Sequence, residues 1–406
     1  MPLYRDHLAQ QFEEKRNEFG QDDEGKRAID VFRDATNEVA QGWSKVDIES
    51  YLDSFDIEGA LPTTEFDDTD DIVIPFEESQ AWESHEGVNR WARSLLEGGT
   101  TVGVDGSQID PVDEFEDPIA LVQAVWLANS HQPGGEYDQG VETEILTPED
   151  LYYEHPQSGL LQVDQEEVST ARYELELQLL GEQIEAVSGH DPPAVVMHDG
   201  PFVLSFTQAF RGPTRSRYGD ALGKVLGASE YHRVPIVGYT AGSKASDFAT
   251  MLERLDLIET DRTVRDYQIF EESVQYWGDR TPLFISRRDN SLEQLQGEYR
   301  GEQYDFTNRI LFTYLNISDG PQLDRIDMPA WVLTEDLVGY VLRAVRAEAG
   351  VGRGYPEILQ AADADAVISQ SDRNEFLHLY QAFSEEYDMD LRWNNKALSK
   401  QRRRRT

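Results

Sequence analysis

The chain contains no cysteine, which excludes disulfides, cysteine-ligated zinc and thiol catalysis. It also lacks any run of the roughly 20 apolar residues that a membrane span needs. The first residues, MPLYRDHLAQQFEEKRNEF, are too charged to form the apolar core of a signal peptide. We therefore expect a cytoplasmic protein that has no membrane partner.

Lysine is scarce, since most of the 36 basic side chains are arginine, and acidic side chains outnumber the basic ones with 78 Asp and Glu. The formal net charge is -42, yet 39% of the residues are hydrophobic and 10% aromatic, which is too much for a disordered acidic chain. A folded protein of this charge is typical of a salt-rich cytoplasm, such as that of a haloarchaeon, where molar salt screens charges beyond about 3 Å. The acidity therefore describes the solvent and does not exclude a nucleic-acid partner.

The pattern of apolar residues divides the chain into three parts. Residues 1–97 predict helices around an acidic loop, and Gly98 and Gly99 form a helix stop signal. Residues 98–383 mix short apolar strands with long helices, and residues 384–406 form a tail that ends in KQRRRRT. This organisation predicts an α/β protein with a mixed sheet flanked by helices and an N-terminal helical extension.

Two predicted strands carry an aspartate that is followed by glycine, Asp105 in TTVGVDGSQID and Asp199 in AVVMHDGPF. We expect each aspartate to close its strand and the glycine to turn the chain. A carboxylate buried there costs several kcal/mol unless a partner or a metal compensates it. The two aspartates are therefore expected to meet at one end of the sheet and to bind Mn²⁺ or Mg²⁺, which prefer oxygen ligands. The alternative is an ordinary Asp-Gly turn at each position.

A long helix, expected at about residues 165–187, supplies a third candidate ligand. Glu176 falls on its apolar side, where an acidic residue needs a reason. A site with several carboxylates commonly holds two cations about 3.5–4 Å apart, which cleave phosphodiesters by activating water and stabilising the leaving oxygen. The alternative is that Glu176 is a boundary residue paired with Arg172.

Basic residues cluster shortly after the second aspartate. FRGPTRSRYG contains Arg211, Arg215 and Arg217 with no acidic residue among them, and Lys244 follows in AGSKASD. In a chain of this charge, a local positive patch predicts a loop that binds the phosphates of a nucleic acid. The alternative is that these are ordinary surface side chains.

Taken together, the motifs resemble those of the NurA family of archaeal and bacterial nucleases. The resemblance depends on VDGSQ (104–108), HDGPF (198–202) and GYPEILQAADADAVIS (354–369), with GYTAGSK and LDRIDMPAWV in the same order. It implies an RNase H-like core and a manganese-dependent deoxyribonuclease with 5′-to-3′ exonuclease and single-strand endonuclease activity. It further implies a homodimer that acts on single- and double-stranded DNA ends with a HerA-like hexameric helicase, in DNA end resection and recombinational repair.

Carried over by position, the resemblance assigns catalysis to five residues, of which the four carboxylates are also metal ligands: Asp105, Glu176, Asp199, Asp363 and Tyr355. Glu174 is an alternative for the helical glutamate. Asp363 stands where the family usually has histidine; an aspartate can bind Mn²⁺ but does not transfer protons near neutral pH as histidine does.

Two other functions compete with the nuclease. GVDGSQ is also similar to the first phosphate loop of actin-like ATPases and sugar kinases, but we find no clear second phosphate loop or adenosine-binding glycine pair. A catalytically weakened subunit that only docks on and regulates a translocase is the second alternative, favoured by Asp363 and by the long N-terminal region.

Overall fold

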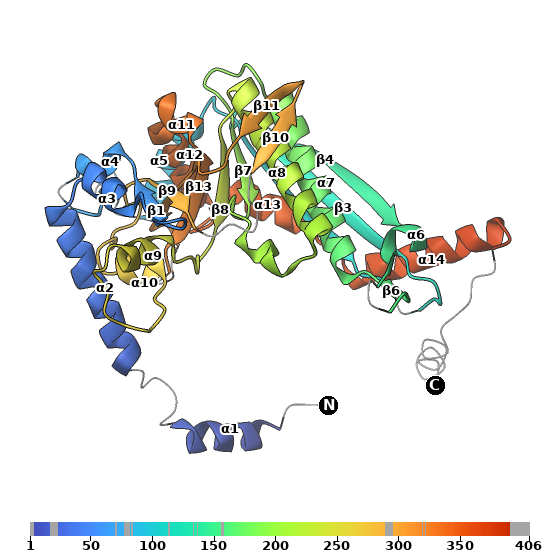
Figure 1. Cartoon of the computed structure of the whole chain (residues 1–406). Coiled ribbons are helices and arrows are strands. Elements are labelled where there is room, and N and C mark those ends of the chain that lie inside the picture. Colours follow the sequence, from blue (N-terminus) through green and yellow to red (C-terminus); the bar gives the residue numbers. More distant parts are fainter. Residues whose placement is uncertain are drawn as a thin grey trace.

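The computed structural model describes residues 4–16, 23–69, 71–76, 82, 84–112, 114–132, 134–135, 137–155, 158–288, 295–318, 320 and 322–389. The predicted basic end of the tail lies outside these residues. A sheet of nine strands forms the centre of the protein (Figure 1). In chain order its strands are β1 (Gly59–Pro62), β2 (Thr101–Ile109), β3 (Ala120–Asn129), β4 (Asp138–Leu146), β7 (Val195–Asp199), β8 (Ile236–Thr240), β9 (Phe284–Arg287), β12 (Ile310–Leu315) and β13 (Asp324–Pro329).

The spatial order of the strands is β1-β9-β12-β13-β8-β7-β2-β3-β4. In the second half of this order, β2 runs antiparallel to β3 and parallel to β7, and β7 runs parallel to β8. This is the strand arrangement of an RNase H-like sheet, so the predicted fold class is confirmed. Two small hairpins lie outside the sheet, β5 (Tyr152–Glu154) with β6 (Leu161–Val163) and β10 (Gln296–Tyr299) with β11 (Glu302–Asp305).

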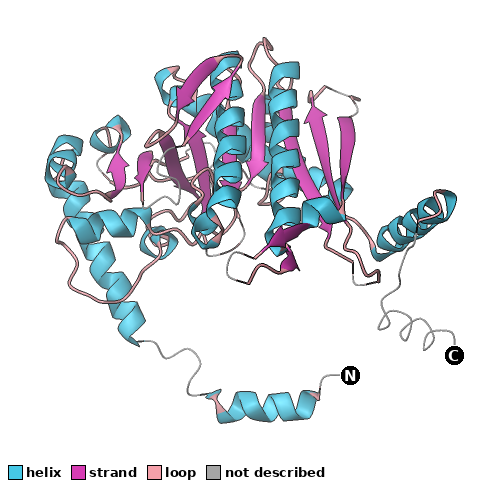
Figure 2. Cartoon of the chain, turned by 45° about the vertical axis from the view of Figure 1, so that its right-hand side comes forward, coloured by secondary structure: helices cyan, strands magenta, loops and turns pink. Residues whose placement is uncertain are grey.

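Helices cover both faces of the sheet (Figure 2). In chain order they are α1 (Arg5–Glu14), α2 (Asp23–Gly42), α3 (Lys45–Leu52), α4 (Thr64–Asp67), α5 (His85–Leu96), α6 (Pro148–Leu151), α7 (Gln165–Ala186), α8 (Gly212–His232), α9 (Asp247–Arg254), α10 (Asp266–Phe270), α11 (Trp331–Thr334), α12 (Val338–Val351), α13 (Glu357–Ala366) and α14 (Gln370–Glu386). None of these helices is long and apolar enough to cross a membrane. The chain leaves α13 at Ala366, and the side chain of Ser369 caps the next helix, α14.

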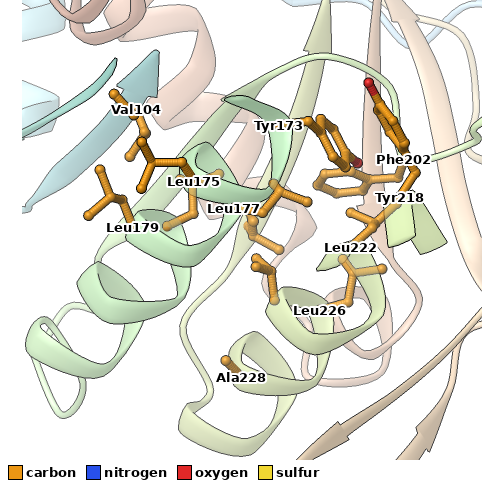
Figure 3. Close-up of a cluster of buried hydrophobic side chains, with 14 of the residues drawn as sticks. Val104, Tyr173, Leu175, Leu177, Leu179, Phe202, Tyr218, Leu222, Leu226 and Ala228 are labelled. Atoms are coloured by element: carbon orange, nitrogen blue, oxygen red, sulfur yellow. The ribbon is translucent and has the colours of Figure 1, made fainter. Parts of the chain in front are cut away.

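The two faces of the sheet have separate apolar cores. On one face, α7 and α8 pack against each other and against the even-numbered side chains of β2, such as Val104 (Figure 3). On the other face, α5, α12 and α13 pack against odd-numbered residues of β7, such as Val195 and Met197. Successive residues of a strand point to opposite faces, so Asp105 and Asp199 belong to the face that α13 covers.

The N-terminal helices α2 and α3 pack with α9 and α10 in a third core at the β1 end of the sheet. The N-terminal region is not entirely helical, since β1 pairs with β9 and so extends the sheet. This strand is only four residues long, too short to produce a readable alternation of apolar and polar residues.

Candidate active site

Asp105 and Asp199 lie beside each other on adjacent parallel strands. The register of β2 and β7 pairs Val104 with His198, so the next residue on each strand is one of the two aspartates. Neighbouring strands are about 4.8 Å apart. The structure thus brings together the two carboxylates that the sequence suggested, at the edge where β7 ends.

The expected turn after Asp105 is wrong. β2 continues to Ile109 and pairs with β3 over its whole length, so Asp105 lies inside the strand, whereas Asp199 is the last residue of β7. Gly106 serves a different purpose: a Cβ atom there would overlap the carboxylate of Glu176. Glycine is needed at this position because the glutamate approaches the backbone of β2.

Glu176 reaches the aspartates from α7 and is buried. Its Oε1 atom lies 3.1 Å from Nη1 of Arg172, but it is buried without a hydrogen-bond partner among the described residues. Burial raises the pKa of Glu176 to about 7; the charge of Arg172 opposes this shift, and the charges of Asp105 and Asp199 add to it. Glu174, the alternative ligand, instead accepts hydrogen bonds from Arg217 (2.5 and 2.9 Å).

The segment around α13 completes the cluster. The phenol of Tyr355, just before the helix, donates a hydrogen bond to the carboxylate of Asp199. Asp363 is exposed on α13, and its charge raises the pKa of both Asp105 and Asp199. Glu176, Tyr355 and Asp363 therefore each interact electrostatically or by hydrogen bonding with Asp105 and Asp199.

The cluster disfavours the ionised state of its own carboxylates. Partial burial raises the pKa of Asp105 to about 6, with the charges of Asp199 and Asp363 adding to the shift. Partial burial also raises the pKa of Asp199, although the hydrogen bond from Tyr355 opposes this. In the part of the chain that the structure describes, however, no three His, Cys, Asp or Glu side chains come close enough to hold a metal ion.

His198, next to Asp199 in sequence, does not replace the missing histidine of α13. Its buried ring faces the opposite side of the sheet, where it packs between Tyr173 and Phe202 at centroid distances of 6.1 and 6.3 Å. Burial, together with the charge of Arg172, lowers its pKa to about 4. His198 is therefore neutral at pH 7 and belongs to the packing between α7 and the sheet.

The predicted basic loop forms the start of α8, where its arginines meet acidic side chains of α7. Arg211 pairs with Asp164 and Glu166, and its guanidinium lies 4.4 Å from the ring centre of Tyr153. Arg217 pairs with Glu167 (2.7 Å) as well as with Glu174.

Arg215 and Lys244 have different surroundings. The guanidinium of Arg215 donates to the carbonyl oxygens of Gln208 and Phe210, both at 3.2 Å. Lys244 is exposed in the turn after β8, at the same sheet edge as Asp199. Lys244 is thus a DNA-binding candidate that lies at the end of the strands where Asp105 and Asp199 are found. Sequence reasoning gave no DNA-binding role to Arg172, although this side chain lies next to Glu176.

Comparison with known proteins gives a family match over most of this region. The NurA domain model matches residues 99–368, which include every residue of the cluster. No curated protein matches the chain.

The search of solved structures finds several nucleases. The NurA nuclease from Sulfolobus solfataricus is 14% identical with a TM-score of 0.46, covering 77% of this chain and 95% of its own. The catalytic domain of human endonuclease V is 15% identical with a TM-score of 0.34, covering 75% of this chain and 100% of its own. A NurA structure bound to dAMP and manganese is 11% identical with a TM-score of 0.30, covering 67% of this chain and 85% of its own.

Because these TM-scores lie below 0.5, the assignment rests on the domain match, which spans more than half of the chain. This protein belongs to the NurA family of DNA nucleases.

Proposed function

We propose that this protein is a metal-dependent deoxyribonuclease whose active site is formed by Asp105, Glu176, Asp199, Asp363 and Tyr355. The observation that carries the proposal is the gathering of carboxylates from four separate elements, β2, α7, β7 and α13, at one edge of the sheet. Burial, and to a smaller extent the charges of the neighbouring carboxylates, raises the pKa of Asp105, Glu176 and Asp199, so their ionised forms are unfavourable here without a compensating positive charge. Perturbed pKa values of this kind gather at functional sites, which supports the assignment.

The residues present fit a divalent cation. The buried Oε1 of Glu176 has no hydrogen-bond partner among the described residues, which leaves it available as a ligand. The donors are all hard oxygens, as Mn²⁺ and Mg²⁺ prefer, and we favour Mn²⁺ because a NurA structure holds manganese. A bound cation of this kind supplies an activated water and stabilises the leaving oxygen of a phosphodiester. Asp105, Glu176 and Asp199 would hold it, with Asp363 as a further ligand from the exposed side.

The remaining groups prepare the site. Tyr355 orients the Asp199 carboxylate through its hydrogen bond and keeps its own proton, because burial and the nearby carboxylates raise its pKa far above neutrality. Asp363 adds a negative charge where the family usually has histidine, so a proton near neutral pH must be taken up by water rather than by this side chain. Lys244 and Arg215 are proposed to contact the DNA backbone. Arg211 and Arg217 were predicted to do the same, and their ion pairs with α7 compete with that role.

Family membership supports the finer parts of the proposal. We propose 5′-to-3′ exonuclease and single-strand endonuclease activity on single- and double-stranded DNA ends, in end resection and recombinational repair. The partners would be a second copy of the chain and a HerA-like hexameric helicase, and residues 98–383 would form the nuclease domain.

The test uses end-labelled single- and double-stranded DNA with the purified protein in high salt, in the presence of Mn²⁺, Mg²⁺ or EDTA. We expect cleavage with Mn²⁺, none with EDTA, and a loss of more than about 100-fold in Asp199→Asn, comparable to the removal of one transition-state contact. Asp365→Asn is the matched control, because Asp365 is an exposed aspartate on the same helix as Asp363. An inert wild type that still changes the ATPase rate of its translocase would instead support the docking-subunit function.

A further inference from the structure

Arg172 lies on α7 one turn before Glu176 and reaches the carboxylate cluster. Its Nη1 donates to the carbonyl oxygen of Gly106 at 3.1 Å and lies at the same distance from Oε1 of Glu176. Its Nε is buried without a hydrogen-bond partner among the described residues, while 35% of the side chain stays exposed. The guanidinium is therefore fixed on the cluster and still accessible from solvent.

The charge of Arg172 acts directly on the predicted active site. It lowers the pKa of both Asp105 and Glu176, against the effect of burial. By contrast, Arg211 and Arg217 are each held between two carboxylates at the interface of α7 and α8. A DNA phosphate that approaches the cluster thus meets the guanidinium of Arg172 among groups that would otherwise repel it.

We propose that Arg172 binds a backbone phosphate of the DNA strand at the carboxylate cluster, an inference that rests on the proposed nuclease function. A guanidinium offers two parallel N–H donors that match the oxygens of a phosphate. Nη1 of Arg172 faces Oε1 of Glu176 and the carbonyl oxygen of Gly106 in β2. A cation held by Glu176 would offset the negative charge that balances Arg172 and would leave the guanidinium to pair with the phosphate.

The proposal predicts opposite effects on the two ligands of the site. Loss of the guanidinium weakens binding of DNA, because a charge-assisted hydrogen bond is removed. It does not weaken binding of Mn²⁺, because a neighbouring positive charge repels a cation. If Arg172 were merely structural, its loss would weaken the binding of both DNA and Mn²⁺, because Glu176 and β2 would lose their support.

The experiment compares wild type, Arg172→Gln, Arg172→Lys and the control Arg300→Gln. The control removes the charge of an exposed arginine outside α7 that pairs with Glu185, a residue of α7 like Arg172. Affinity for a labelled single-stranded oligonucleotide is measured over a salt series, in EDTA and in Ca²⁺, and Mn²⁺ binding is measured by calorimetry without DNA. In Ca²⁺ we expect Arg172→Gln to bind DNA about 10- to 100-fold more weakly, the range of one hydrogen bond to a charged group. Its slope of log affinity against log salt should fall by about 0.7.

Arg172→Lys should keep the slope and recover part of the affinity, and Arg300→Gln should behave as wild type. Arg172→Gln should bind Mn²⁺ at least as tightly as wild type. Unchanged DNA affinity and slope in Arg172→Gln would overturn the inference, and so would a joint loss of Mn²⁺ binding and thermal stability. A wild type that does not cleave DNA in Mn²⁺ would refute the nuclease function instead, while the DNA affinities still test Arg172.

Discussion

Replacing Gly106 by alanine is the most direct test of the geometry of the cluster. A Cβ atom at this position would overlap the Glu176 carboxylate, and it would also lie 3.0 Å from Cγ of Glu176 and from the carbonyl oxygen of Gln123. The carbonyl belongs to β3, which pairs with β2 along its length and cannot move away. The strain therefore falls on the side chain of Glu176.

The size of the effect follows from the cost of overpacking. Extra methyl groups in a packed interior cost about 1–3 kcal/mol. If Glu176 avoids this cost by rotating away, the site loses a ligand; if it stays, the strain opposes its binding geometry. Because each loss of about 1.4 kcal/mol in binding free energy weakens affinity tenfold, we expect Gly106→Ala to bind Mn²⁺ about 10- to 100-fold more weakly. DNA cleavage at limiting Mn²⁺ should fall by a similar factor.

Gly181→Ala is the matched control. Gly181 lies on α7, the helix that carries Glu176, and the nearest atom to its added Cβ is Cγ2 of Val225 at 3.9 Å, an ordinary contact. Alanine in place of glycine in a helix stabilises by about 0.5–1 kcal/mol, so this variant should bind Mn²⁺ as wild type and unfold at slightly higher urea.

Both variants are assayed by Mn²⁺ calorimetry and urea unfolding. Wild-type Mn²⁺ affinity together with wild-type stability in Gly106→Ala would refute the position of Glu176 described above. The assignment of Glu174 as the helical ligand would then be the better one.

Three further predictions depend on buried or clustered charge. Because the pKa of Glu176 is raised from 4.5 to about 7 in the folded protein, the fold binds more protons than the unfolded chain between these values, and metal-free stability falls as pH rises through that window. Glu176→Gln should therefore gain on wild type by up to about 3 kcal/mol at pH 8 and by much less at pH 5, in urea unfolding without divalent metal; an equal gain at both pH values would contradict this. Asp363→Asn should move the low-pH side of the pH–rate profile of DNA cleavage to lower pH, because the charge of Asp363 raises the pKa of Asp105 and Asp199. A shift of the same size in Asp365→Asn would argue against a specific effect of Asp363. Arg325→Leu should destabilise by about 3–5 kcal/mol, because it leaves two buried aspartates, 2.7 and 2.8 Å from the guanidinium, without their partner; an unchanged urea midpoint would contradict this.

The strands that could be predicted are those with mainly apolar residues. β2 and β7 have this pattern, and the structure places both where an apolar run indicated. β13 was missed because its sequence, DRIDMP, contains Asp324, Arg325 and Asp327, all of which are buried in a network of ion pairs and hydrogen bonds. β4 was missed because it is a mostly exposed edge strand, so no apolar face marks it.

The candidate site could be predicted only in part from local patterns. A strand pattern selects Asp105 and Asp199, and the apolar stripe of a helix selects Glu176. Tyr355 and Asp363 came from the family resemblance alone, because tertiary packing brings α13 to the cluster. Its approach needs Gly103, where a Cβ would lie 3.0 Å from the carbonyl oxygen of Ile358.

The basic loop shows why charge in this chain must be judged in three dimensions. Arg217 has no acidic neighbour in its own loop, yet its partners on α7, Glu174 and Glu167, are 43 and 50 residues away in sequence. With a net charge of -42, most surface arginines meet a carboxylate somewhere. At molar salt the screening length is about 3 Å, so a distant positive patch adds little attraction for DNA. Binding then depends on contacts at hydrogen-bond distance, so we expect the guanidinium of Arg172, beside the carboxylates, to contribute more than Arg211 and Arg217, whose charges are already paired.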